Sequence, residues 1–303
     1  MPEKLFEPLP ISYRGLFADS HLVDAQQFGK SLIGTSKVAN SICHKLFFGA
    51  VTHDPRSYHI RFCVGSSREN GLLQELFAVV SSGQLPLFMP ILSVVGKEVI
   101  QITFKAMVAK ILHRKSEQAL AIEALHSLAM HHSEFAQQVH RGHMRDKKWL
   151  QKTIDALAQE NRSPLRELPE PVGKTVRLIQ VGDDGKGPTI DEPTAEVLRS
   201  RDPLELGDPI ELDVKIEGVF KTNGACKVRL LGENKIVTGK ITDPSLDKPH
   251  NAYTKALDED APLHVVAQPT LKNGRVHKLF ITSAEAIGTG SAVIVGKPTT
   301  QIE

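Results

Sequence analysis

Histidines are the residues in this chain best suited to chemistry, and they are concentrated in one segment. Five of the thirteen lie within eighteen residues, at His126, His131, His132, His140 and His143. On a helix His140 and His143 would share one face, with His132 close to it. Together with a neighbouring carboxylate they could bind zinc, which takes N, O and S ligands in a tetrahedral arrangement. Gly142 interrupts this face and no HExxH pattern is present, so a solvated polar face is the favoured reading and the metal site an alternative.

A basic stretch follows the histidines. Residues 141–152 contain one acidic residue, Asp146, and five cations with a tryptophan among them. A basic patch beside an aromatic side chain is typical of nucleic-acid binding. The predicted nucleic-acid or polyanion site is therefore Arg141, Arg145, Lys147, Lys148 and Trp149. The alternative is an exposed charged helix whose tryptophan packs into the core.

A third polar group lies in the proline-bearing segment 242–253. Its predicted ligand rim consists of Asp247, His250, Asn251 and Tyr253. The alternative is an ordinary entry to a helix, with Asn251 as its N-cap.

Signatures of catalysis are missing from the sequence. The segment from Asp24 to Ser31 lacks the first glycine of a phosphate-binding loop, and Gly65-Ser-Ser67 lacks the GxSxG pattern. The sequence predicts no catalytic residue and no cofactor, and these patterns favour a non-enzymatic protein over an enzyme.

The composition is that of a globular protein. The chain has 303 residues, a net charge of +2, 41% hydrophobic and 24% charged residues, enough for two domains. Its three cysteines form no CxxC pair, and residues 1–10 have no apolar signal core, so we expect a cytoplasmic protein.

One uncharged segment, Leu76–Gly96, is 21 residues long, which is sufficient in length for a membrane span. Polar residues at 81–84 and prolines at 86 and 90 interrupt it, so buried elements are the better interpretation. Membrane association through residues 76–112 remains an alternative.

The first 160 residues are predicted to form an α+β domain with long amphipathic helices. Asp24 is expected to cap a helix that runs to Phe47 and ends at Gly49. Alternation predicts a strand over Tyr58–Val64, whereas Leu72–Val80 is either a strand or a buried helix. Glu98–Leu112 is predicted to be a deeply buried or partner-binding helix. The proline-bearing segment 161–174 is predicted to be a linker.

The C-terminal region predicts a barrel. After a lead-in from residue 175 we expect five strands and one helix, followed by a tail over 288–303. The strands are Pro209–Phe220, Ala225–Leu231, Lys235–Ile241, Leu263–Thr270 and Arg275–Thr282, with a helix near Asn251–Leu257. This order is typical of the OB fold, which often binds oligonucleotides or oligosaccharides. Residues 205–285 nevertheless hold twelve acidic and eleven basic residues and three aromatic ones, which suits a docking module equally well.

Several stretches resemble those of uncharacterised bacterial two-domain proteins with an α/β N-terminal region and a C-terminal five-stranded β-barrel. They are Tyr13-Arg-Gly through Asp24, Ser31-Leu-Ile-Gly34, Ile190-Asp-Glu-Pro193, Gly239–Pro244 and His250-Asn-Ala-Tyr253. The resemblance implies the barrel and a bacterial source, and it brings no activity and no functional residues.

The sequence therefore predicts an interaction or adaptor protein. It would self-associate as a homo-oligomer through the apolar N-terminal region, residues 72–112, and dock a protein partner or ligand with the barrel. The alternatives are nucleic-acid binding by helix 141–152 with the barrel, and membrane association.

Overall fold

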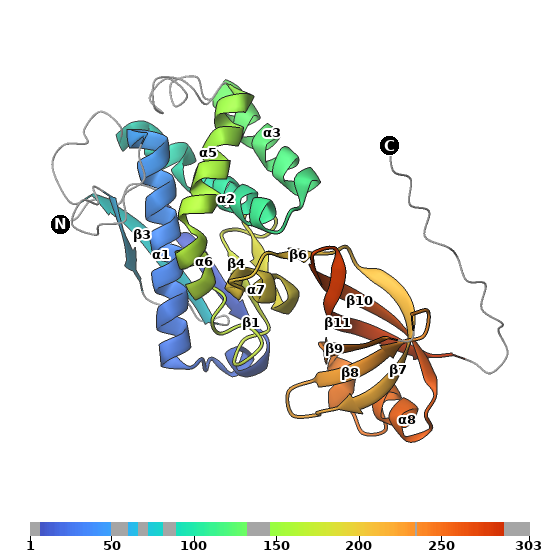
Figure 1. Cartoon of the computed structure of the whole chain (residues 1–303). Coiled ribbons are helices and arrows are strands. Elements are labelled where there is room, and N and C mark those ends of the chain that lie inside the picture. Colours follow the sequence, from blue (N-terminus) through green and yellow to red (C-terminus); the bar gives the residue numbers. More distant parts are fainter. Residues whose placement is uncertain are drawn as a thin grey trace, which may run out of the picture. The chain divides into compact units, whose positions relative to one another are not determined.

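The protein consists of two compact units, Met1–Leu206 and Gly207–Glu303 (Figure 1). The computed structural model describes residues 7–49, 60–65, 72–80, 89–131, 146–233 and 235–287. Each unit has a hydrophobic core of its own. The chain is therefore an α+β protein with an N-terminal sheet-and-helix unit and a C-terminal OB-like barrel, as the sequence predicts.

An antiparallel sheet organises the N-terminal unit, with β1 at its centre. The strand order is β2-β3-β1-β4-β5, formed by β1 (Leu9–Arg14), β2 (Ile60–Val64), β3 (Leu72–Val80), β4 (Leu178–Val181) and β5 (Thr189–Ile190). Leu9 pairs with Leu76 of β3, and Ile11 pairs with Val181 of β4. Leu72–Val80, which periodicity leaves open between strand and helix, is thus a strand.

Helices complete the N-terminal unit. They are α1 (Ala25–Phe48), α2 (Met89–Ile111), α3 (Lys115–His131), α5 (Lys147–Glu160), α6 (Arg162–Glu167) and α7 (Glu192–Arg199), with a short 3-10 helix, η1 (Leu16–Ser20). The caps predicted for α1 are confirmed. The carboxylate of Asp24 accepts a hydrogen bond from the Gln27 amide at 2.9 Å. Gly49 ends the helix in the left-handed region with φ 76°, where glycine carries no steric penalty.

The apolar helix α2 is used inside the unit. Val99, Phe104 and Met107 are almost completely buried and belong to the N-terminal core. Self-association through residues 72–112 was expected because this segment is unusually apolar. Most of its described apolar residues are buried in the N-terminal core. No helix in the described ranges is long and apolar enough to cross a membrane.

The boundary between the units lies later than the sequence suggests. Segment 161–174, predicted as a linker, holds α6 and contributes the buried Leu165, Leu168 and Val172 to the N-terminal core. β4 and β5, predicted as a lead-in to the barrel, belong to the N-terminal sheet. Prolines indicate turns, but a turn can be buried as well as exposed, and composition does not distinguish the two cases.

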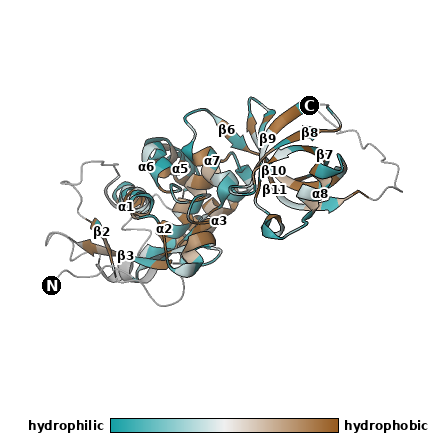
Figure 2. Cartoon of the chain, turned by 90° about the horizontal axis from the view of Figure 1, so that it is seen from below, coloured by the Kyte–Doolittle hydropathy of each residue, from teal (hydrophilic) through white to brown (hydrophobic). Residues whose placement is uncertain are grey.

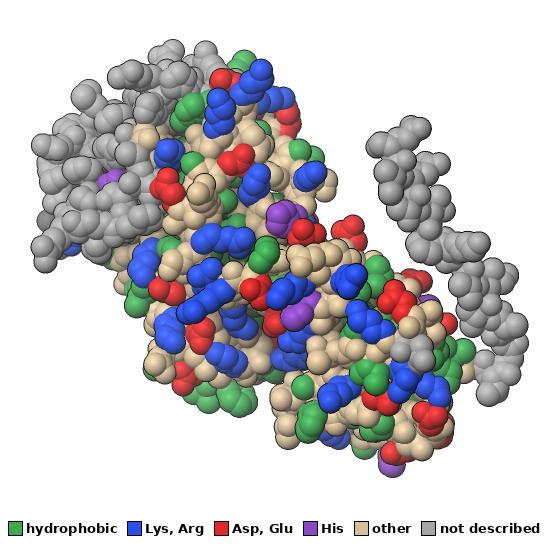
Figure 3. All heavy atoms as spheres, viewed as in Figure 1, with side chains coloured by type: hydrophobic (Ala, Val, Ile, Leu, Met, Phe, Trp, Pro, Cys, Tyr) green, Lys and Arg blue, Asp and Glu red, His purple; other side chains and the backbone are tan. Residues whose placement is uncertain are grey.

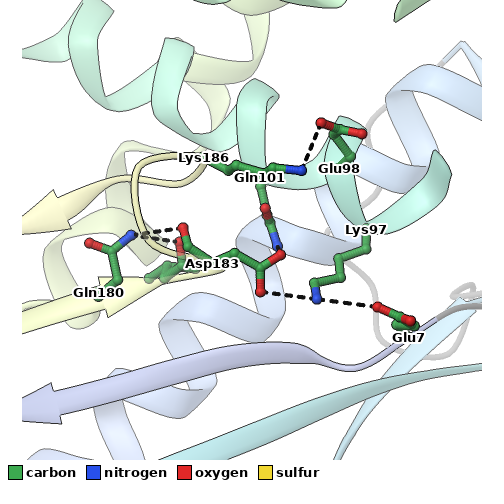
Figure 4. A network of polar contacts seen from close by, with 8 residues as sticks. Glu7, Lys97, Glu98, Gln101, Gln180, Asp183 and Lys186 are labelled. Atoms are coloured by element: carbon green, nitrogen blue, oxygen red, sulfur yellow. Dashed lines mark hydrogen bonds and ion pairs between the residues drawn. The ribbon is translucent and has the colours of Figure 1, made fainter.

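Polar contacts hold the β4–β5 turn against α2 (Figure 4). The carboxylate of Asp183 accepts from Gln101 at 3.2 Å and lies 3.0 Å from the Lys97 ammonium. Partial burial alone would raise the pKa of Asp183, but the interactions with Lys97 and Gln101 outweigh it and lower that pKa. Lys186 of the turn pairs with Glu98 at 3.1 Å.

Five strands close the C-terminal barrel. They are β7 (Ile210–Val219), β8 (Ala225–Leu230), β9 (Lys235–Ile241), β10 (Pro262–Lys272) and β11 (Arg275–Ala286). Antiparallel pairs join β7 to β8, β8 to β9, β10 to β7 and β10 to β11, and the parallel pair of β9 with β11 completes the ring. Hydrophobic and hydrophilic residues follow one another along these strands (Figure 2), as expected when one face of each strand lines the core.

The helix α8 (Ala252–Asp258) lies between β9 and β10, where the OB order places it. Tyr253 of α8 is completely buried. Its hydroxyl donates to Asp243 at 2.8 Å, which ties the helix to the end of β9.

The contacts of Asp183 predict a measurable effect on stability. We expect Asp183→Asn to lower the free energy of unfolding by about 1 kcal/mol or less at pH 7, because the lost interactions are partly screened by water. Since the folded-state pKa is lowered, this contribution is present above the pKa of the unfolded chain and disappears as the pH falls through the folded-state value. The difference between wild type and variant, measured by denaturant unfolding, should therefore shrink between pH 7 and about pH 3.

The matched control is Asp184→Asn. Asp184 pairs with Arg14 at 3.3 Å but its side chain is 77% exposed, so its loss should change stability by less than about 0.5 kcal/mol. Equal effects of the two variants would contradict the role given to Asp183.

Candidate nucleic-acid interface

The outer face of β8, β9 and β11 carries a row of basic side chains. Lys227 of β8 pairs with Thr238 of β9, and Thr238 pairs with Lys278 of β11. Residues paired across neighbouring strands point to the same side, so all three lie on one face. The two lysine Cα atoms are separated by two strand spacings, about 10 Å. Lys240 lies two residues further along β9 on the same side.

The inward alternation confirms that this face points outward. Cys226, Val228, Val237, Leu279 and Ile281 belong to the barrel core. The residues between them therefore face away from the core.

Charge in the barrel is separated by strand. β8 and β9 contain Lys227, Arg229, Lys235 and Lys240 and no acidic residue, whereas β7 contains Glu211, Asp213 and Glu217. Both kinds of charge are present on the side of the barrel visible in Figure 3. The near-neutral total for residues 205–285 therefore conceals a basic face.

One pair crosses the border between these strands. Arg229 binds Glu217 at 2.6 Å. The hydrogen bond and the charge of Glu217 raise the pKa of the Arg229 guanidinium. Arg229 is thus paired within the barrel. The other basic residues of this face are Lys227, Lys240 and Lys278.

An exposed aromatic residue lies at one end of the face. Phe220 follows β7, its amide donates to the Ala225 carbonyl at 2.7 Å, and its side chain is 66% exposed. Ala225 in turn pairs with Lys240. Phe280 lies on the same outward side, because it pairs with Lys240 between the inward Leu279 and Ile281. It is only 1% exposed, with the Lys278 ammonium 4.9 Å from its ring centre, so it offers no free ring for stacking.

The β10–β11 hairpin lies at the other end of the face. Lys272, Asn273, Arg275, Val276 and His277 line a hollow of about 500 Å³ there. In the OB fold, the surface of the second and third strands and the loops after the first and fourth strands bind oligonucleotides. β8, β9, the β7–β8 loop and this hairpin occupy those positions.

The predicted basic helix is only partly within the described ranges. Arg141 and Arg145 lie outside them. At the start of α5, Lys147 pairs with Glu123 at 2.5 Å, and the partly buried Trp149 packs against the core. Lys148 is exposed and its amide donates to the capping Asp146 at 2.9 Å. The described part of this site therefore offers two exposed lysines, one of them paired with Glu123, and a tryptophan that packs against the core.

The predicted ligand rim divides into two pairs. Asp247 and His250 are exposed. Asn251 caps α8 by accepting from the Thr254 amide at 3.0 Å and donates to the Leu246 carbonyl at 2.9 Å, and Tyr253 is buried. The side chains of Asn251 and Tyr253 thus serve the internal structure of this segment.

The metal hypothesis cannot be followed to its ligands, because His132, His140 and His143 all lie outside the described residues. Within the described ranges no group of three or more His, Cys, Asp or Glu side chains could hold a metal ion.

Sequence reasoning missed Lys227, Lys240, Lys278 and the exposure of Phe220. The alternation within β8 and β9 carries the signal for the lysines, since strict period two assigns them to the outer face. A count of acidic and basic residues over the whole barrel does not reveal these lysines, because acidic residues elsewhere in the barrel offset their charge.

Comparison with protein families covers nearly all the described chain. Residues 9–199 match a domain of unknown function (DUF7946), and residues 208–285 match a family of unknown function (DUF7947). No curated protein and no solved structure matches the chain. In this chain the DUF7946 domain precedes the DUF7947 barrel. Because the first match spans more than half of the sequence, the chain belongs to the DUF7946 family.

Proposed function

We propose that the protein binds single-stranded nucleic acid along the outer face of β8, β9 and β11. The observation that supports this most directly is the row Lys227–Thr238–Lys278, which crosses β8 and β9, two strands without acidic residues, and reaches β11. Its position coincides with the binding surface of the OB fold.

The physical basis is a combination of charge and stacking. Phosphates are attracted to the lysine row, and release of counterions makes such binding weaken with salt. Phe220 is 66% exposed at the edge of the face, where its ring is available to stack on an unpaired base. A duplex keeps its bases stacked inside, so this arrangement favours a single strand.

The lysine row predicts a salt-dependent loss of affinity. We expect the double variant Lys227→Glu, Lys278→Glu to weaken binding of a fluorescent fifteen-nucleotide thymidine oligomer by at least about tenfold. The slope of log K against log salt should also decrease, by roughly 0.7 for each lost phosphate contact. Fluorescence anisotropy at several salt concentrations measures both quantities.

Lys248→Glu, Lys255→Glu, at the α8 end of the barrel, makes the same change in charge and serves as control. Equal losses in the two double variants would contradict the assignment.

Phe220 predicts an effect of a different kind. We expect Phe220→Ala to weaken binding about fivefold to a hundredfold, since stacking contributes ~1–3 kcal/mol per base, while leaving the salt slope unchanged. Phe220→Trp should retain or improve affinity. An unaffected affinity in Phe220→Ala would exclude stacking at this position.

A second function, contact with a protein partner or a second copy of the chain, has separate support. Leu16, Phe17 and Leu22 around η1 are 42%, 62% and 65% exposed. Leu16 has a positive φ value of 57°, a conformation that is uncommon for a bulky residue. A fixed, exposed apolar group of this kind is typical of an interaction site.

The exposed apolar residues around η1 predict which surface would mediate self-association of the chain. If size exclusion with light scattering shows an oligomer, Phe17→Asp, Leu22→Asp should convert it to a monomer without loss of helical content by circular dichroism. Ile33→Asp, at a 52% exposed position on α1, is the control. A monomeric wild type at high concentration, or an oligomer that survives the double variant, would remove the support for this second function.

A further inference from the structure

A long groove lies in the N-terminal unit, between α2, α3 and the β4–β5 turn. Its volume is about 590 Å³, within the ~300–1,000 Å³ typical of sites for small molecules. It is separate from the barrel face, so an inference drawn from it does not depend on the proposed nucleic-acid binding.

The lining is apolar along most of its length. It follows α2 from Ile102 and continues to Leu112, directly after the helix ends at Ile111, which is a distance of about 15 Å. The facing residues of α3 include Ala121 and Ala124, whose small side chains leave the space between the helices open. Leu120 stands at the edge with 71% of its side chain exposed. Ala124 is exposed as well, whereas Val108, Ala109, Leu112 and Ala121 expose only a few per cent of their surface, so the apolar lining is narrow.

Charged side chains gather at both ends, and most of them compensate one another. At the turn end Lys186 pairs with Glu98 at 3.1 Å (Figure 4). At the opposite end Arg114 pairs with Glu117 at 3.0 Å. Each of these two pairs has a net charge of zero.

Lys105 is the exception. Its ammonium donates to the Gly185 carbonyl at 2.9 Å, and in the described part of the chain no carboxylate lies within ion-pair distance of it. An ammonium has three donors, so this one retains capacity for an anionic partner. Lys105 lies near the turn end of the groove, next to the apolar surface.

We propose that this groove binds an elongated amphipathic anion, of the class of medium-chain carboxylates. The anionic group pairs with Lys105 beside the β4–β5 turn, and the alkyl chain lies along α2 and α3 toward Leu112. Charge complementarity at one end and an apolar surface about 15 Å long fit a ligand with a single charge and a linear apolar body.

Isothermal titration calorimetry of the full chain with decanoate, well below micelle-forming concentrations, tests the proposal. We expect saturable binding with one site per chain, and binding of uncharged decan-1-ol that is weaker by about tenfold, because a charge-assisted hydrogen bond is lost. Lys105→Met should weaken decanoate by about the same factor and leave decan-1-ol unchanged. Lys115→Met, at an exposed position beyond the groove, is its control.

A second variant tests the apolar part without disturbing the core. Ala124 is an exposed lining residue, so Ala124→Phe should fill the groove, preserve the circular dichroism spectrum and weaken both ligands at least about tenfold. Ala119→Phe, exposed on the same helix but outside the lining, should leave both affinities unchanged.

Three outcomes would overturn the proposal: no saturable binding of decanoate, affinities insensitive to Ala124→Phe, or equal affinities for decanoate and decan-1-ol. Binding of an acidic amphipathic peptide in place of decanoate would identify the groove as a protein-docking site instead. Loss of oligonucleotide binding by barrel variants has no bearing on these results, so failure of either proposal can be recognised separately.

Discussion

The parallel pairing of β9 with β11 closes the barrel, and the properties of the C-terminal unit depend on that closure. It brings β8, β9 and β11 side by side in a register that aligns Lys227, Thr238 and Lys278. The approach of the strands is close at Gly239, where a Cβ would lie 2.9 Å from the Cys226 sulfur and 3.1 Å from the Leu279 carbonyl. Glycine at this inward position therefore allows the three strands to approach this closely.

In the N-terminal unit the corresponding constraint is the central position of β1. It is paired on both sides, so the sheet needs β4 from a distant part of the sequence. The turn that follows β4 is then held against α2 through Asp183, Lys186 and the Gly185 carbonyl. These contacts also form one wall of the groove beside Lys105, so the stability of the sheet and the shape of the groove depend on the same residues.

Local signals in the sequence predicted much of this architecture. Capping by Asp24 and Gly49 placed α1, and alternation with turn residues placed all five barrel strands. The sequence could not assign 161–174 to the first unit, because its prolines do not show that Leu165, Leu168 and Val172 are buried in the N-terminal core. It could not assign β4 either, because the partner strand β1 lies more than 160 residues earlier. It also could not separate Phe220, which follows β7 and is 66% exposed, from Phe280, which lies in the middle of β11 and is 1% exposed. That difference is decided by tertiary packing, which neither periodicity nor composition records.

The central claim is that the basic face of the barrel contacts nucleic acid, and photo-crosslinking tests it most directly. A single-stranded oligonucleotide containing 4-thiouridine would be irradiated with the full chain, and the cross-linked peptides identified by mass spectrometry. The account predicts cross-links at Phe220 and within β8, β9 and the β10–β11 hairpin, and their loss at high salt. Cross-links confined to α5 around Lys147–Lys152, or no cross-links at any salt concentration, would contradict it.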